Sequence, residues 1–368
     1  MLIYCLICLA ALTAAVLLLI FLIIPLLKGL FSPLPTVRYT PSSFVTSVTV
    51  DEKPTDSEAD FSSAQHEAKL SYSTVSDPYL YGDSLVFSTA SMVKGVQVYN
   101  NIIVYNINTE EEKKLNISVQ YENLINFVMN DDYIVWCDAQ AENGGRICGY
   151  DRKSGTQFKI KDYVYAAPKL SLSGNILAFM QQAGDETDRL YLYDLVSREA
   201  VTYKVFQSQD GLPTQAHIYG DILCYAIPSD KESGYAISLV NVKTGEENVI
   251  ETGKSVRSPK TNGKDVAFLS STIGAPTDLY VMSGDDAILI ASDVLNFDMC
   301  DAGVVYSKDE CVYLYMSATK QSMRLNTNIS RAYLAEADGD NICWYDITGG
   351  YNDSADIVRY IKVSELNV

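Results

Sequence analysis

One strand pattern returns seven times along this 368-residue chain. Each copy has a turn with Gly, Asp or Asn, then three alternating residues, and then an aromatic residue. The copies read GDSLVF, DDYIVW, GNILAF, GDILCY, GKDVAF, DAGVVY and GDNICW, and they end at Phe87, Trp136, Phe179, Tyr225, Phe268, Tyr306 and Trp344. The steps between these aromatics are 49, 43, 46, 43, 38 and 38 residues. This spacing indicates one four-stranded unit per copy, and such a unit buries its faces only against neighbours of its own kind.

The residues around each copy complete the unit. In the third unit, NILAFMQQ is followed by RLYLYDL and AVTYKV, and a further short strand (AAPKLS) precedes them. The sequence therefore predicts an all-β fold, a seven-bladed β-propeller with four-stranded blades. The last unit has a third strand, DIVRYIKV (356–363), but the chain ends five residues later. We expect the segment AQHEAKLSYS (64–73) to supply the missing outer strand, so that residues 66–368 form the closed propeller.

The N-terminal segment predicts a membrane anchor. Residues 1–27 contain no charged side chain and are long enough to cross a bilayer core as one transmembrane helix. We therefore expect an anchor over residues 1–30, and a flexible linker over 31–65, which is rich in Pro, Ser, Thr and acidic residues.

The orientation of that anchor is less constrained. Lys28 and Arg38 follow the span, and by the positive-inside rule alone they would place the propeller in the cytoplasm. We favour the outside of a bacterial cell, because a single N-terminal anchor before an acidic β-rich domain is usually an exported arrangement. The expected location is the cell membrane, with an extracytoplasmic propeller.

The net charge of −18 argues against some partners. Nucleic acids and anionic lipid surfaces both attract cationic patches, so neither is an expected partner. A protein, a peptide or an envelope glycan fits the acidic surface better.

The stretch DRLYLYDLVSREAVTYKV resembles the repeats of TolB-like propellers, in which an alternating strand ends in Asp and leads through a polar turn into another strand. Prolyl oligopeptidase-type enzymes share this loose pattern in their propeller domains. The resemblance covers roughly residues 66–368 and lacks the Gly-His and Trp-Asp pairing of true WD40 repeats. It implies a propeller used for binding, and no family site residue matches.

Motifs of known enzymes are absent from the sequence. His66 and His217 are the only histidines, and no G-x-S-x-G elbow exists for a serine hydrolase. H-x-x-x-H does not occur, and the one C-x-x-C, Cys5 to Cys8, lies inside the apolar N-terminal run, so no metal or cofactor is expected. The acidic segments 130–132, 183–188 and 336–341 resemble pieces of calcium loops, but they fall where the repeat requires tight turns, and we interpret them as turns.

Two cysteines present a further question. Cys137 and Cys148 flank one loop between a second and a third strand. They could form a disulfide across the hairpin if the compartment is oxidising.

The functional expectation is a membrane-anchored, non-catalytic propeller that binds a partner. Long loops between second and third strands mark one face, and the residues we expect there are Asp185, Asp188, Lys231, Asp278, Tyr351 and Asp353. The alternatives are a glycoside hydrolase that uses paired carboxylates in the central funnel, and a purely structural scaffold.

Overall fold

The structure is a computed structural model. It describes residues 45–47, 50–51, 56–57, 61 and 64–366, except 122, 141–142, 184–185, 208–214, 230–234, 272–276, 284–285, 327–330 and 349–354. Contacts divide the chain into two units, Met1–Tyr39 and Thr40–Val368, and all described residues belong to the second. The predicted anchor and the first part of the linker lie outside the described residues. Among the described residues, no helix is both long enough and apolar enough to cross a membrane.

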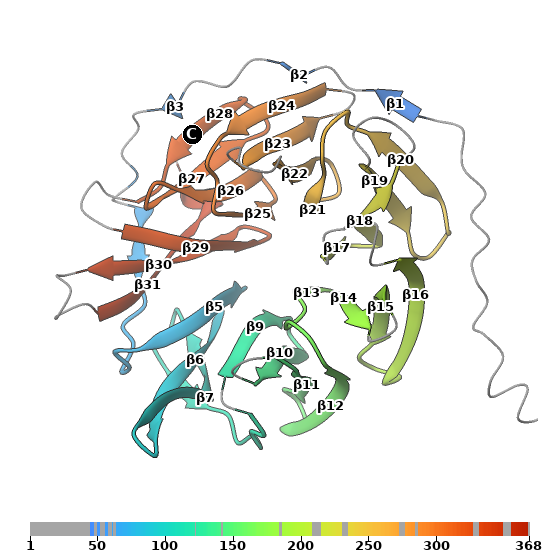
Figure 1. Cartoon of the computed structure of the whole chain (residues 1–368). Coiled ribbons are helices and arrows are strands. Elements are labelled where there is room, and N and C mark those ends of the chain that lie inside the picture. The colour runs from blue at the N-terminus through green and yellow to red at the C-terminus, as the bar shows by residue number, and fades with distance from the viewer. Residues whose placement is uncertain are drawn as a thin grey trace, which may run out of the picture. The chain divides into compact units, whose positions relative to one another are not determined.

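The described part is all-β, with six sheets that stand around a common centre (Figure 1). The largest sheet has eight strands in the order β12-β11-β10-β9-β7-β6-β5, and β8 pairs with β7 beside this path. Its strands are Val75–Tyr81 (β5), Ser84–Val93 (β6), Val96–Asn106 (β7), Glu112–Lys114 (β8), Asn123–Met129 (β9), Tyr133–Ala139 (β10), Gly145–Asp151 (β11) and Thr156–Tyr163 (β12).

The other sheets each contain four consecutive antiparallel strands, or three in the last one. The first two have Leu170–Ser173 (β13), Ile176–Ala183 (β14), Thr187–Asp194 (β15) and Glu199–Gln207 (β16), then Ala216–Tyr219 (β17), Ile222–Pro228 (β18), Tyr235–Asn241 (β19) and Glu247–Glu251 (β20). The next two have Arg257–Thr261 (β21), Val266–Ser270 (β22), Asp278–Ser283 (β23) and Asp286–Ala291 (β24), then Asn296–Cys300 (β25), Gly303–Lys308 (β26), Cys311–Met316 (β27) and Gln321–Arg324 (β28). The last has Arg331–Asp338 (β29), Asn341–Thr348 (β30) and Ala355–Lys362 (β31), followed by the 3-10 turn Val363–Glu365.

Short strands from the N-terminal side join four of these sheets. His66–Glu67 (β4) pairs antiparallel with β31 and becomes the fourth strand of the last sheet. Val45–Ser47 (β1), Val50–Asp51 (β2) and Asp56–Ser57 (β3) pair in parallel with β20, β24 and β28, the outermost strands of three successive sheets. The N-terminal chain therefore adds a fifth strand to each of those three sheets.

Buried clusters lie between neighbouring sheets. One cluster joins Leu85 and Phe87 on β6 to Tyr345 and Val358 of the last sheet, and another joins Val135 on β10 to Phe179 on β14. The seven repeated aromatics all lie in second strands, and each is at most 2% exposed: Phe87, Trp136, Phe179, Tyr225, Phe268, Tyr306 and Trp344. Sheets that bury both faces in this way require side chains of this kind on every strand.

The recurrence of Asp at the end of third strands is explained by the turn that follows. The Asp194 carboxylate accepts hydrogen bonds from the backbone N–H groups of Val196, at 2.7 Å, and Ser197, at 3.0 Å. Asp151 accepts the equivalent bonds from Lys153 and Ser154. This side-chain turn reverses the chain between the third and fourth strands, and it explains why Asp recurs there.

The predicted disulfide does not form. Cys137 and Cys148 are both buried free thiols. Across the hairpin, Cys148 is opposite Trp136, whereas Cys137 is opposite Ile147. Since neighbouring residues of a strand point to opposite faces, the two sulfurs lie on different sides of the sheet, in two separate clusters.

Candidate functional site

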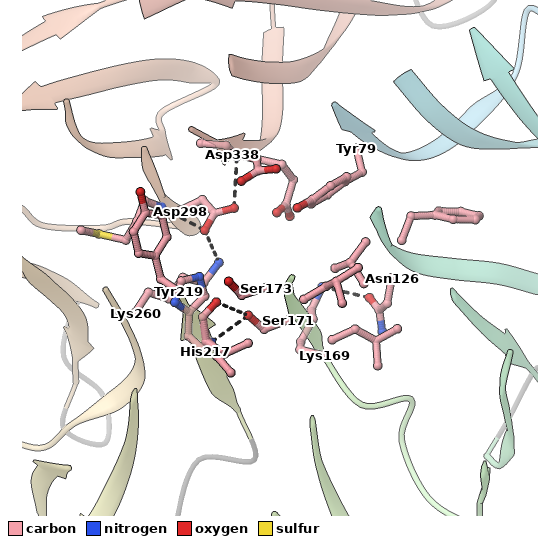
Figure 2. A pocket seen from close by; sticks show the side chains of 18 of the residues that line it. Tyr79, Asn126, Lys169, Ser171, Ser173, His217, Tyr219, Lys260, Asp298 and Asp338 are labelled. Atoms are coloured by element: carbon pink, nitrogen blue, oxygen red, sulfur yellow. Dashed lines mark hydrogen bonds and ion pairs between the residues drawn. The ribbon is translucent and has the colours of Figure 1, made fainter. Parts of the chain in front are cut away.

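The candidate site is a cavity of about 650 Å³ at the centre of the sheets. Its walls are the innermost strands β5, β9, β13, β17, β21, β25 and β29 and the residues beside them. In Figure 2 the labelled side chains point into the cavity from around it, and Lys169 and Asn126 lie across from Asp298, Lys260 and His217.

Four of these inner strands carry a β-bulge with a non-glycine residue in the left-handed region. The residues are Asp77 (φ 49°), Asn126 (φ 56°), Ser258 (φ 48°) and Leu334 (φ 51°), and all four line the cavity. The strand register shifts at each of them. A bulge re-aims the side chains that follow it.

The bulges direct polar and ionisable side chains into the cavity. Tyr79, Lys260 and Glu336 each follow a left-handed residue by two positions, and each lines the cavity. For Leu334 the conformation is sterically costly, because a branched side chain is poorly tolerated at positive φ. Such strain is concentrated at functional sites in proteins.

An ion pair anchors one wall of the cavity. Lys260 Nζ lies 2.7 Å from Asp298 Oδ1, and both side chains are largely buried. Asp298 also accepts hydrogen bonds from the backbone N–H groups of Met299, at 2.9 Å, and Ala337, at 3.1 Å. Although burial opposes its charge, Lys260 holds the pKa of Asp298 below the ordinary value. Asp298 therefore stays ionised and joins β21, β25 and β29.

The pKa values of two further carboxyl groups, Glu336 and Asp338 on β29, are raised, whereas that of Asp298 is lowered. Burial, together with the negative charge of Asp298, raises the pKa of Glu336 to about 8. Burial and the charges of Asp298 and Asp301 raise the pKa of Asp338 to about 7. Near neutral pH the cavity therefore contains one protonated carboxyl and one that titrates.

The neighbouring groups are neutral. Burial and the adjacent Lys260 lower the pKa of His217 to about 4, so its imidazole carries no charge at neutral pH. His217 Nδ1 accepts a hydrogen bond from the backbone N–H of Thr261 at 3.3 Å, which assigns the proton to Nε2. Burial and the nearby carboxylates, led by Asp338, raise the pKa of Tyr79 well above its ordinary value.

Ser171 on β13 and Lys169, which directly precedes β13, form the adjoining wall of the cavity. The Ser171 hydroxyl accepts from the Ile218 N–H at 2.9 Å and so joins β13 to β17. Lys169 Nζ donates to Asn126 Oδ1 at 3.1 Å, and its charge lowers the pKa of Asp77 against the larger effect of burial, which raises it.

Of the predicted loop residues, the two that the structure describes, Asp188 and Asp278, do not line this cavity. Asp188 lies on β15 and is 5% exposed, and Asp278 begins β23, while Asp185, Lys231, Tyr351 and Asp353 lie outside the described residues. The loop-face site stays a prediction. The sequence signal for the central cavity was present, since Asp131, Asp132, Glu336 and Asp338 belong to two of the acidic segments interpreted as turns. Among the residues that the structure describes, no group of three or more His, Cys, Asp and Glu side chains is arranged to hold a metal ion.

Comparison with known proteins shows the fold. No protein-family model matches the sequence, and no curated protein matches it. The β-propeller domain of the Trilobed protease from Pyrococcus furiosus is similar, with a TM-score of 0.61 and 12% identity over 81% of this chain and 99% of that one. The acylaminoacyl peptidase from Pyrococcus horikoshii has a TM-score of 0.57 and 12% identity over 79% of this chain but 51% of that one. An oligogalacturonate lyase from Vibrio parahaemolyticus has a TM-score of 0.51 and 13% identity over 78% of this chain and 90% of that one.

These similarities confirm an all-β propeller and correct the functional expectation. The similar propellers belong to peptidases and a lyase, which are enzymes, so the expected non-catalytic binding module is wrong. The glycoside hydrolase alternative is wrong as well, because the similar carbohydrate-acting enzyme is a lyase. A TolB protein from Acinetobacter baumannii is also similar, with a TM-score of 0.42 and 13% identity over 71% of this chain and 59% of that one.

Proposed function

We propose that this chain is an enzyme that breaks a bond in its substrate by general acid–base catalysis in the central cavity. The observation that carries the proposal is the separation of carboxyl pKa values within one cavity, with Asp298 held ionised and Glu336 and Asp338 raised to about 8 and 7. Carboxyl groups whose environments push their pKa values apart are the usual acid and base of such reactions.

The roles follow from the protonation states. Between about pH 7 and pH 8, Asp338 is largely ionised and accepts a proton from the substrate or from water, while Glu336 is largely protonated and donates one to the leaving group. The Lys260–Asp298 ion pair acts through Glu336, because the charge of Asp298 keeps the Glu336 proton in place. Asp298 and Lys260 are therefore positioning residues.

Similar proteins support an organisation in which the propeller itself holds the site. This chain covers 90% of the Vibrio lyase but about half of the peptidase. An oligogalacturonate lyase is also described in complex with manganese. The residues lining this cavity fit that metal poorly, because among the described residues no three His, Cys, Asp or Glu side chains are arranged to hold a metal ion. No step of the proposed mechanism uses a metal.

Incubation with short peptides and uronic-acid oligosaccharides, followed by mass spectrometry, tests the proposal. Hydrolysis adds the mass of one water to the summed products, whereas elimination adds nothing, so the products also report the reaction. We expect turnover with a bell-shaped pH dependence whose limbs lie near pH 7 and pH 8, and loss of about 10²-fold or more in Glu336→Gln and Asp338→Asn. Turnover that is unchanged in both variants would refute the proposal; Asp293→Asn, an exposed carboxyl elsewhere, is the matched control.

We further propose that the ring has seven four-stranded blades closed by residues 64–73. In support, β7 and β9 of the eight-stranded sheet pair through one residue pair, Tyr99 with Asn123, so the sheet divides there into two units of four. The Pyrococcus furiosus domain is described as having an open Velcro topology, whereas here β4 pairs with β31. Removal of residues 64–73 should lower the midpoint of urea unfolding; an unchanged midpoint would contradict closure.

Membrane attachment is a separate proposal. The uncharged run of residues 1–27 would anchor the chain, with residues 31–65 as the linker and the propeller outside the cell. Protease treatment of intact cells should then digest the linker, and protection until the cells are lysed would refute this orientation.

A further inference from the structure

The charge balance of the central cavity restricts what can occupy it. Six carboxyl groups line it: Asp77, Asp131, Asp132, Asp298, Glu336 and Asp338. The ammonium groups of Lys169 and Lys260 are the only cationic side chains among the described lining residues. Coulomb interactions are strong inside a cavity that excludes much of the water, so this imbalance of charge acts directly on a bound ligand.

Both ammonium groups are already engaged. Lys260 is neutralised by Asp298 at 2.7 Å, and Lys169 donates to Asn126 and offsets the charge of Asp77. Glu336 shares a hydrogen bond with Asp298 and interacts with the charge of Lys260. Within the described part of the chain, Asp338, Asp131 and Asp132 form no ion pair with a lysine or arginine of the cavity, whose two ammonium groups are engaged elsewhere. Asp338 on β29 and the carboxyl groups of the β9–β10 turn are therefore available to a ligand.

Aromatic rings complete the surroundings. Tyr79 and Tyr219 line the same cavity, and the Tyr219 hydroxyl is fixed by a hydrogen bond to Asp301 at 3.0 Å. An aromatic face attracts a cation, and this attraction is strongest where water is excluded. Rings and carboxyl groups together favour an ammonium ligand over a carboxylate.

We propose that the substrate of the central cavity carries a protonated amine, which Glu336 and Asp338 on β29 recognise. This inference rests on the acid–base function proposed above and deepens it by naming the substrate class. It separates this chain from its similar lyase, because oligogalacturonate is a polyanion that the uncompensated carboxyl groups would repel.

Binding of an ammonium group must change the protonation of the carboxyl groups that contact it. Without ligand, burial keeps part of Asp338 protonated, and an ammonium group nearby favours its ionised form. Glu336 keeps its proton beside the charged Asp298 and can accept a hydrogen bond from the ammonium group through its carbonyl oxygen. Binding therefore releases protons and tightens as pH rises through about 7. The other groups that face β29 across the cavity do not reproduce this window: Asp298 is ionised, His217 is neutral, Tyr79 is protonated and Lys260 is charged.

Calorimetry of the full chain with three tripeptides tests the inference. The probes are trilysine, trilysine with acetylated side chains and a blocked N-terminus, and triglutamate. We expect trilysine to bind at least about tenfold more tightly than the acetylated peptide, and triglutamate to show no binding. The trilysine affinity should increase about tenfold from pH 6 to pH 8.5, and titrations in phosphate and Tris buffers should report proton release.

Variants locate the binding and separate the two proposals. Glu336→Gln with Asp338→Asn should remove at least about tenfold of the trilysine affinity, and Asp293→Asn, which is exposed, should remove none. Equal loss in both would assign the binding to the acidic surface and overturn the inference, as would preferred binding of triglutamate. Turnover of a neutral or anionic substrate that Glu336→Gln abolishes would overturn the amine inference alone. Amine binding with turnover unaffected by both variants would instead overturn the acid–base function.

Discussion

In each sheet the first strand lies innermost and lines the central cavity, and the second strand lies next to it. The two differ in how strictly their residues repeat from sheet to sheet. Every second strand places an aromatic residue at the equivalent position, and each of these side chains is at most 2% exposed. The inner strands carry bulges, left-handed residues and charged side chains that differ from sheet to sheet. Repetition therefore builds the scaffold, and departures from repetition build the site.

The largest test of this comparison is the removal of a repeated aromatic. Trp136 is fully buried, and its indole N–H has no hydrogen-bond partner among the described residues, so Trp136→Ala removes packing alone. We expect a loss of about 4 kcal/mol in the free energy of unfolding, measured by urea denaturation. Trp136→Phe should cost less than about half as much. A loss below about 1 kcal/mol for the alanine variant would mean that the repeated aromatics do not hold the scaffold.

A charged residue on an inner strand should matter in a different way. Lys260→Met leaves the buried Asp298 carboxylate without its partner, and we expect a loss of about 3 kcal/mol in the free energy of unfolding. Adding Asp298→Asn removes the unpaired charge and should restore at least about half of that loss. If the double variant is no more stable than Lys260→Met, the ion pair is not the cause.

The buried carboxyl group of Glu336 should lower the stability of the folded protein as pH rises. Glu336 ionises near 4.5 ordinarily and near 8 in the folded protein, so stability is lost as pH rises between these values. Glu336→Gln avoids this loss and should raise the free energy of unfolding by about 1–2 kcal/mol at pH 8 after allowance for solvent screening, with little change at pH 4. An equal effect at both pH values would contradict a raised pKa.

The smallest test concerns backbone strain. Leu334 has φ of 51° and is 42% exposed, so Leu334→Gly relieves the backbone and loses little packing. We expect a gain of up to about 1 kcal/mol in stability. Leu295→Gly changes another exposed leucine that lacks a positive φ, and it should lower stability by a similar amount. Equal changes in the two variants would show that the bulge is unstrained.

The same comparison explains what could be read from the sequence. A repeated alternation ending in an aromatic predicts the strand and the propeller, because burial on both faces imposes one pattern on all copies. The cavity residues follow no shared pattern. Glu336 and Asp338 resemble any acidic turn in the sequence, and a bulge at Leu334, a residue type that disfavours positive φ, decides where Glu336 points.

The charged neighbours of each cavity residue could not be predicted from the sequence either. Lys260 and Asp298 lie 38 residues apart and meet only because two inner strands converge at the centre. The strand that pairs with β31, by contrast, was expected from the sequence, because the last unit lacks a fourth strand and the segment 64–73 precedes the first unit. The loop residues Asp188 and Asp278 were chosen for loop length, which does not report the direction of a side chain.

The most direct test of the account is a ¹³C NMR titration of the side-chain carboxyl groups in protein labelled at Glu and Asp. The account predicts two carboxyl groups that titrate near pH 7 and pH 8, of which the higher is lost in Glu336→Gln and the lower in Asp338→Asn. If every carboxyl group titrates below about pH 5, as it does in ordinary solvated positions, the cavity holds no acid and base poised for catalysis, and the central claim is wrong.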